Sequence, residues 1–252
     1  MYQLPVALQM YTLRDDAVKD FAGTIRRVAA MGYAGVELAG TGGMSAADLR
    51  ALLEDNNLQI VGAHVPLGAL EGDLGATVDY HQELGTPYVV CPFLPKERQT
   101  AEGYAQVAVL LNTVGARLRD AGMQLAYHNH AFEFEPLAGG TRGYDLLIDG
   151  SDPELVQIEL DTFWVQRAGL DPAQTLRKYA GRVPLIHLKD MTAGDEPTFA
   201  EVGEGIMDFG AIFAAAEIAG AKFYIVEQDV CGRPPLESVR ISLDNLRNMG
   251  IA

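Results

Sequence analysis

Residues 123–133 read Met-Gln-Leu-Ala-Tyr-His-Asn-His-Ala-Phe-Glu, a short apolar run that ends in two imidazoles and a carboxylate. Alternation along a strand sends every second side chain to the same face, so His128 and His130 point together and a short turn could bring Glu133 beside them. Such a group can bind a metal ion or transfer protons. Taken alone, it is about as often a hydrogen-bonded strand end, so the rest of the chain must decide.

The same pattern, an apolar run with a polar end, recurs eight times, and each run leads into a segment with helical spacing. We predict strands at Val6–Met10, Gly35–Leu38, Ile60–His64, Tyr88–Cys91, Gln124–His128, Val156–Asp161, Val183–Leu188 and Phe223–Glu227. We predict helices at Phe21–Met31, Ala46–Asn56, Leu74–Leu84, Ala101–Ala121, Tyr144–Ile148, Pro172–Tyr179, Phe209–Ala219 and Leu236–Asn248.

Eight strand–helix pairs in 252 residues match the usual size of a (β/α)8 TIM barrel of the α/β class. No linker or low-complexity tract divides the chain, so we predict a single barrel domain over residues 1–252. A doubly wound open sheet is the alternative. It usually has fewer strands, and no glycine-rich phosphate loop follows the first strand here.

Charge and composition exclude several classes of protein. The net charge of −15 would repel a phosphate backbone, so a nucleic-acid partner is disfavoured. The two cysteines, Cys91 and Cys231, do not form a disulfide framework, and each is expected to be a buried thiol. No signal-like segment begins the chain and no stretch reaches about eighteen uninterrupted apolar residues. We therefore expect no membrane partner and a cytoplasmic location.

A barrel places catalytic groups at or just beyond the C-terminal ends of its strands. Each polar residue there is more often structural, because the chain leaves the core at these points. Four of the five histidines nevertheless fall at predicted strand ends, whereas His81 lies in a helical segment with a packing or solvated role. The polar residues at these ends are Glu37, His64, His128, His130, Glu159, Asp161, His187, Lys189, Asp190, Glu227 and Asp229.

Four short motifs in the second half of the chain resemble those of one family. They are Leu160-Asp161-Thr162-Phe163, Ile186-His187-Leu188-Lys189-Asp190, Gly203-Glu204-Gly205-Ile206-Met207-Asp208-Phe209 and Val226-Glu227-Gln228-Asp229. Their order and placement are similar to the xylose isomerase-like barrels called sugar phosphate isomerases/epimerases. The Tyr-His-Asn-His-x-x-Glu version of the fifth strand resembles a branch with inosose dehydratases and enzymes of oxidised sugars or glycosides.

This resemblance implies one divalent metal ion, held by a carboxylate of strand five, an Asp, a His and a Glu. Asp161, His187 and Glu227 match the last three ligands. His128 stands where the ketose epimerases have Glu, so we expect Glu133 as the replacement ligand and keep His128 as the competing one. The donor set suits manganese first, with magnesium, cobalt or zinc as alternatives. Asp229, Asp190 or Glu159 could orient His187 from behind.

Such a centre supports removal of the proton between a metal-bound carbonyl and its neighbouring hydroxyl. The expected catalytic residues are Glu133, Glu227, His128, His130 and Lys189. Among them Glu227 is both ligand and base, the two imidazoles transfer protons or bind substrate, and Lys189 stabilises the oxyanion. Reprotonation gives isomerisation or epimerisation of a keto sugar or cyclitol, which is the leading hypothesis. Loss of a β-substituent, as in an inosose dehydratase or a keto-glycoside lyase, is the runner-up.

Five further residues are candidates for substrate binding, each with a plain structural alternative. His64 would bond a sugar hydroxyl or serve as a strand-end histidine. Trp164 would form an indole wall, although core packing is the commoner role of a single tryptophan. Glu204 lies in a glycine-flanked loop that turn solvation also explains. Gln9 and Tyr11 could line the mouth or fill the barrel end.

Two other functional classes compete with the sugar or cyclitol enzyme. An abasic-site endonuclease of the same superfamily would need more histidines for three zinc ions and a basic DNA face. The chain has five histidines and a charge of −15, which argues against it. A non-catalytic sugar-binding barrel is disfavoured by the ligand set. Arg14 is the one obvious cation near the mouth, so a phosphate on the substrate stays open. The resemblance also suggests a homodimer.

Overall fold

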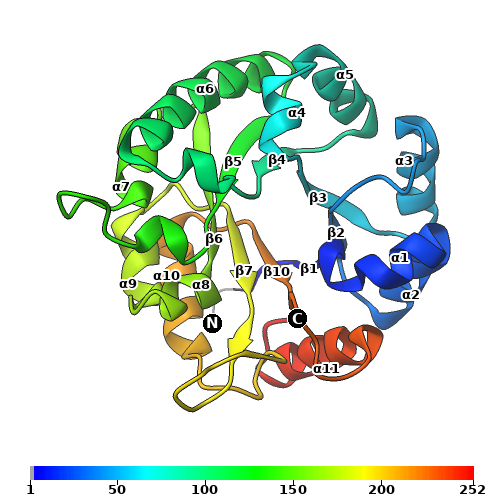
Figure 1. Ribbon diagram of the computed structural model, residues 1–252. Helices are drawn as coiled ribbons and strands as arrows, with labels where there is room; N and C mark the ends of the chain where they lie inside the picture. The colour runs from blue at the N-terminus through cyan, green and yellow to red at the C-terminus, as the bar shows by residue number, and fades with distance from the viewer. Residues whose placement is uncertain (1–2) are drawn as a thin grey trace.

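The computed structural model describes residues 3–252 and forms a closed barrel of eight parallel strands. Around the ring the strands follow the order β1-β10-β7-β6-β5-β4-β3-β2 (Figure 1). Their bounds are β1 Val6–Gln9, β2 Gly35–Leu38, β3 Gln59–His64, β4 Tyr88–Cys91, β5 Gln124–His128, β6 Val156–Asp161, β7 Leu185–Leu188 and β10 Phe223–Val226. The predicted α/β class and TIM-barrel architecture are confirmed, with strand ends displaced by one or two residues.

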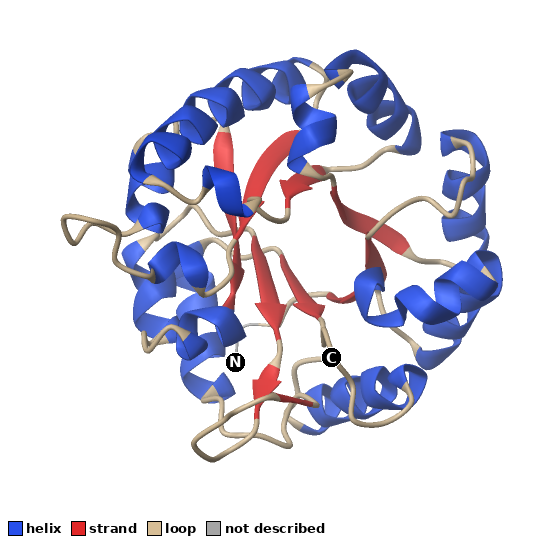
Figure 2. Cartoon of the chain, in the orientation of Figure 1, coloured by secondary structure: helices blue, strands red, loops and turns tan. Residues whose placement is uncertain are grey.

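Helices surround the ring of strands (Figure 2). The eight predicted helices are α2 Phe21–Met31, α3 Ala46–Asp55, α5 Leu74–Leu84, α6 Ala101–Asp120, α7 Gly143–Asp149, α9 Pro172–Lys178, α10 Phe209–Ala219 and α11 Pro235–Asn248. Three short helices follow strand ends and were not predicted: α1 Arg14–Lys19, α4 Leu67–Glu71 and α8 Thr162–Arg167. Within residues 3–252, no helix is long and apolar enough to cross a membrane.

The interior of the barrel is layered along its axis. A lower layer of small and branched apolar side chains fills the interior, as the parallel-barrel geometry requires; it consists of Ala7, Val61, Val90, Ala126, Leu185 and Ile225. Above it the strands end in polar residues held side by side by the register, which pairs Gln9 with Glu37, His128 with Glu159, and Asp161 with His187. The apolar layer thus forms the floor under a buried polar layer.

The segment after β7 is organised around the carboxylate of Asp190. Asp190 is the first residue of a two-stranded antiparallel hairpin formed by β8 (Asp190–Met191) and β9 (Phe199–Ala200). The side chain then accepts hydrogen bonds from the backbone N–H groups of Gly203, Gly205 and Met207 at 2.9–3.0 Å. A Cβ on Gly205 would lie 2.3 Å from Asp190 Oδ1, so this close approach requires glycine. The backbone of the motif Gly203-Glu204-Gly205 therefore surrounds the carboxylate of Asp190.

Both cysteines are free thiols, but only one lies where the sequence suggested. Cys91 is buried at the end of β4, and burial raises the pKa of its thiol to about 12. Cys231 is only partly buried, because it lies in the loop between β10 and α11 and not in the core. The prediction of two buried thiols was wrong for Cys231.

Candidate metal centre and pocket

A pocket of about 520 Å³ opens at the C-terminal ends of the strands, the face on which barrel enzymes carry their active sites. Its floor is polar and its rim is largely apolar. Tyr11 and Phe93 stand at the rim with 43% and 47% of their surface exposed. The lining residues are Tyr11, Ala39, Gly40, His64, Pro66, Pro92, Phe93, His128, His130, Glu227 and Asp229.

Four buried side chains at this end bring potential metal ligands together. One ligand atom from each of His128, Asp161, His187 and Glu227 lies within 4.8 Å of the others. His128 Nε2 lies 3.7 Å from Asp161 Oδ2, and His187 Nδ1 lies 2.9 Å from Glu227 Oε2. Two carboxylates and two imidazoles suit a divalent ion such as manganese or zinc. The residues present therefore fit the metal that the family resemblance implies.

The structure corrects the expected position of Glu133. It lies on the 3-10 turn Phe132–Phe134 and is fully buried. Within residues 3–252 it belongs neither to this group of potential ligands nor to a second, overlapping one formed by His64, His128, Glu159 and His187. Its Oε1 accepts a hydrogen bond from the Tyr127 hydroxyl at 2.8 Å, and its Oε2 accepts one from the backbone N–H of His130 at 2.8 Å. Burial raises the pKa of Glu133 to about 8. Its carboxyl group binds the turn and the end of β5, and His128, not Glu133, lies in the group of potential ligands.

Lys189 brings a fixed positive charge to the centre. Its buried ammonium lies 2.9 Å from Asp161 Oδ2, 2.7 Å from Glu227 Oε2 and 2.7 Å from Asp229 Oδ2. Burial opposes the charge, but these three carboxylates outweigh it and raise the pKa of Lys189. The same ammonium lowers the pKa of Glu227 against the effect of burial. The carboxylates therefore already stabilise a cation at this place.

His130 faces the pocket beside the ligand group. Burial and the nearby charge of Lys189 lower its pKa to about 3, so its imidazole is neutral at ordinary pH. Its Nδ1 is buried without a hydrogen-bond partner. The ring packs edge-on against Phe93 and His128, with ring centroids 5.4 and 5.1 Å apart. A neutral imidazole with an unbonded nitrogen can accept a proton but is a poor proton donor. Of the roles expected from the sequence, His130 in this state therefore suits that of a proton acceptor.

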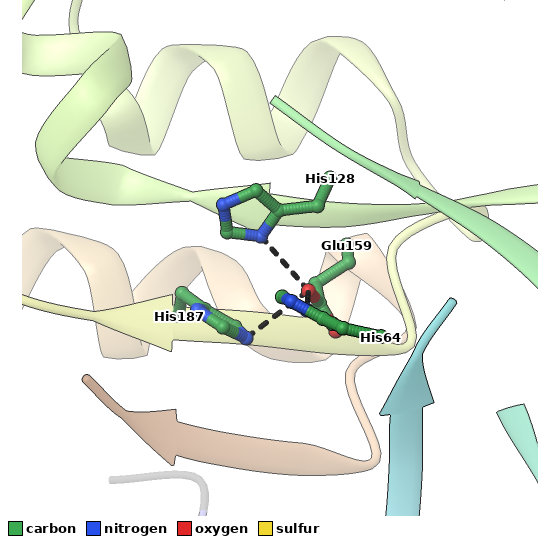
Figure 3. A group of neighbouring side chains, drawn as sticks. All are labelled: His64, His128, Glu159 and His187. Carbon is green, nitrogen blue, oxygen red and sulfur yellow. Dashed lines mark hydrogen bonds and ion pairs between the residues drawn. The ribbon is translucent and has the colours of Figure 1, made fainter. Parts of the chain in front are cut away.

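Behind the ligand group lie two buried glutamates, of which the sequence suggested a role only for Glu159, as a residue that could orient His187. Glu37 Oε2 lies 2.7 Å from His187 Nε2, and Glu159 Oε1 lies 2.8 Å from His128 Nδ1 and 3.1 Å from His187 Nε2. Figure 3 shows Glu159 among the imidazoles of His64, His128 and His187. Both glutamates lie near the C-terminal ends of their strands, β2 and β6, and only their inward orientation would have distinguished them from solvated residues at strand ends.

His64 bridges these two carboxylates and is not left free for a sugar hydroxyl at Nε2. That nitrogen lies 2.8 Å from Glu159 Oε1 and 3.2 Å from Glu37 Oε2. Burial lowers the pKa of His64, but the two carboxylates outweigh it and raise the pKa to about 10. His64 still lines the pocket with one edge.

The other substrate-binding candidates separate into those at the pocket and those away from it. Tyr11 lines the pocket, whereas Gln9 is buried and donates from Nε2 to Glu37 Oε2 at 2.7 Å. Trp164 is half-buried, and its ring packs 5.4 Å from that of His130. Glu204 lies next to Arg233, 2.9 Å from its Nη1.

One further expectation was wrong, and one cation expected near the mouth is already hydrogen-bonded. Asp190 cannot orient His187, because its oxygens hold the backbone of the loop 203–207. The guanidinium of Arg14 is held by two backbone carbonyls, since Nη1 donates to that of Tyr11 and Nη2 to that of Asp229, each at 2.9 Å. Of the three residues proposed to orient His187, Glu159 contacts it directly.

Comparison with known proteins agrees with this architecture. The model of the xylose isomerase-like TIM barrel family matches residues 25–249. The chain belongs to this family. Among solved xylose isomerase-like structures, a sugar phosphate isomerase/epimerase from Parabacteroides distasonis superposes with a TM-score of 0.85 at 27% identity, over 97% of this chain and 98% of the other.

Curated relatives of this xylose isomerase-like chain include inosose dehydratases. The protein from Clostridium beijerinckii is 26% identical over 86% of this chain and 85% of its own length. The one from Lacticaseibacillus casei is 29% identical over 58% of this chain. That second match spans about half of the relative, 54% of its length.

Proposed function

We propose that this protein is a divalent-metal-dependent enzyme that removes the proton next to the carbonyl of a keto-cyclitol or keto sugar and expels a β-hydroxyl as water. The observation that carries the proposal is the position of His130, a neutral imidazole with a free Nδ1, in the same pocket as the four-ligand group. The names of the inosose dehydratase relatives support elimination as the outcome.

The residues divide the work between binding, charge stabilisation and proton transfer. His128, Asp161, His187 and Glu227 would hold the ion, which would supply Lewis-acid polarisation of a carbonyl oxygen. The ammonium of Lys189, fixed by Asp229, would stabilise negative charge that develops on the substrate oxygen.

His130 would act first as base and then as acid. Its neutral ring would accept the substrate proton, and the resulting imidazolium would return a proton to the leaving β-hydroxyl. One C–H bond and one C–O bond break, a carbon–carbon double bond forms, and water leaves. The lowered pKa of His130 makes its imidazolium a strong acid, which favours this second transfer, and it makes the neutral ring a weak base for the first.

Isomerisation or epimerisation is the second candidate function. It is favoured by the full-length structural match to proteins described as sugar phosphate isomerases/epimerases. The first step would be the same, and the proton would return to carbon without loss of the hydroxyl.

The test is incubation of the manganese-loaded protein with keto-inositols, ketoses and 3-keto-glycosides in deuterated water, followed by mass spectrometry and NMR. Dehydration predicts loss of water from a keto-inositol, whereas isomerisation or epimerisation predicts deuterium in a product of unchanged composition. His130→Ala should lower the rate by about 100-fold or more while metal binding persists. If no substrate loses its α-proton, or if His130→Ala keeps full activity, the proposed function is rejected.

A further inference from the structure

The two imidazoles of the ligand group present different nitrogens to it. His128 directs Nε2 towards Asp161, while its Nδ1 faces Glu159 at 2.8 Å. His187 directs Nδ1 towards Glu227, while its Nε2 faces Glu37 at 2.7 Å. Each ring therefore has one nitrogen towards the centre and the other against a buried carboxylate.

This arrangement dictates which tautomer each ring adopts when it binds a metal. A metal-binding nitrogen must be deprotonated, so the single proton of a neutral ring lies on the other nitrogen. Glu159 favours the proton on His128 Nδ1, and Glu37 favours it on His187 Nε2. The two carboxylates thereby leave the lone pairs of His128 Nε2 and His187 Nδ1 for the ion.

The fold makes room for Glu37 in particular. Gly62 on β3 lies against the carboxylate, and a Cβ built there would be 2.7 Å from Glu37 Oε1. The other oxygen is held from two sides, by Gln9 Nε2 at 2.7 Å and by His64 Nε2 at 3.2 Å. Because both sides of the carboxylate are constrained, its position relative to His187 is fixed by packing as well as by hydrogen bonds.

Two buried carboxylates behind a metal centre would be costly without a counter-charge. His64 lies between them, 2.8 Å from Glu159 and 3.2 Å from Glu37. Its ring is nearly parallel to that of His187, with centroids 5.7 Å apart. His64 thus joins the two carboxylates into one unit.

We propose that Glu37 and Glu159 are positioning residues that set opposite tautomers of His187 and His128, so that the two rings present Nδ1 and Nε2 to one divalent ion, with His64 bridging the pair. The inference rests on the proposed function only in taking the four-ligand group to hold a divalent metal ion. The tautomer assignment of His128 stands on the protein alone.

The experiment measures manganese affinity and histidine tautomers in the full chain. Glu37→Gln and Glu159→Gln should each weaken manganese binding by about 10- to 100-fold. Glu154→Gln is the matched control, since Glu154 is an exposed acid just before β6 and undergoes the same chemical change. Gly62→Ala keeps every polar group and should weaken binding in the same direction by displacing Glu37. It also provides a second test if Glu37→Gln does not fold.

NMR of isotope-labelled histidine nitrogens in the metal-free protein gives the independent readout. His128 should carry its proton on Nδ1 in the parent and lose that preference in Glu159→Gln. Absence of manganese binding in the parent, with this tautomer change intact, would reject the metal-dependent function but keep Glu159 as the residue that sets the tautomer. The proposal is overturned if the tautomer is unchanged in Glu159→Gln, or if the parent binds manganese and the Glu→Gln variants match Glu154→Gln in affinity.

Discussion

At the scale of single residues, the composition of the ligand group depends on which of two side chains near His130, that of His128 or that of Glu133, faces the barrel axis. His128 ends β5 with its ring directed inward, so it reaches Asp161 and Glu159. Glu133 lies on the turn that follows the strand. Its carboxyl group there accepts hydrogen bonds from the Tyr127 hydroxyl and from the backbone N–H of His130. Strand alternation placed the imidazoles correctly, but it holds no information about a turn after the strand.

Substitution of these two residues should therefore have unequal effects on metal binding. We expect His128→Gln to raise the manganese dissociation constant by more than about 100-fold, because a ligand is lost. Glu133→Gln should change it by less than about 10-fold, because this carboxyl bonds the Tyr127 hydroxyl and the His130 backbone and none of the four potential ligands. Electron paramagnetic resonance of free manganese measures both, with the exposed Glu135→Gln as control. A larger effect from Glu133→Gln would restore Glu133 as the ligand.

His81 gives a pH-dependent contribution to stability away from the centre. Burial lowers its pKa from 6.5 to about 4, and its Nδ1 lies 3.1 Å from the Thr86 hydroxyl oxygen. Since the unfolded chain binds this proton more readily, the contribution is complete above about pH 6.5 and is lost as the pH falls towards about 4.

We expect this group to remove about 2 kcal/mol of unfolding free energy between about pH 7.5 and about pH 5. Urea denaturation of the parent and of His81→Gln at both pH values measures the difference. The variant should lose correspondingly less stability over this interval. Equal losses in the two proteins would show that His81 is not buried in its neutral form.

At the scale of elements, the long units could be predicted and the short ones could not. Each of the eight strands and their outer helices has enough residues to show a periodic pattern. The helices α1, α4 and α8, with five or six residues each, and the two-residue strands β8 and β9 are too short for any period. They form because tertiary contacts hold them.

The loop 203–207 shows such a contact and gives a test. Asp190→Ala removes the acceptor for the N–H groups of Gly203, Gly205 and Met207, which should cost about 3 kcal/mol of unfolding free energy. Amide hydrogen exchange of these residues should accelerate more than that of the barrel strands. Asp195→Ala, an exposed acid of the hairpin, is the control and should change neither quantity. Unchanged exchange in Asp190→Ala would mean that the loop is held by other contacts.

At the scale of the whole molecule, the barrel brings together residues that are distant in the sequence. Glu37 and His187 are separated by 150 positions and lie 2.7 Å apart. The sequence motifs predicted Asp161, His187 and Glu227 as a group, because strand ends of one barrel face the same mouth. Glu159 was one of three residues expected to orient His187, but the contact between Glu37 and His187 could not be predicted, since it depends on barrel closure and on the space left by Gly62.

We expect the four side chains at these strand ends to bind one metal ion. Calorimetric titration of chelator-treated protein with manganese chloride tests it most directly. The structure predicts one ion bound per chain in the parent and loss of that binding in Asp161→Ala, with the fold of the variant checked by circular dichroism. A parent protein that binds no manganese or zinc, or an Asp161→Ala variant that binds as the parent does, would contradict the account.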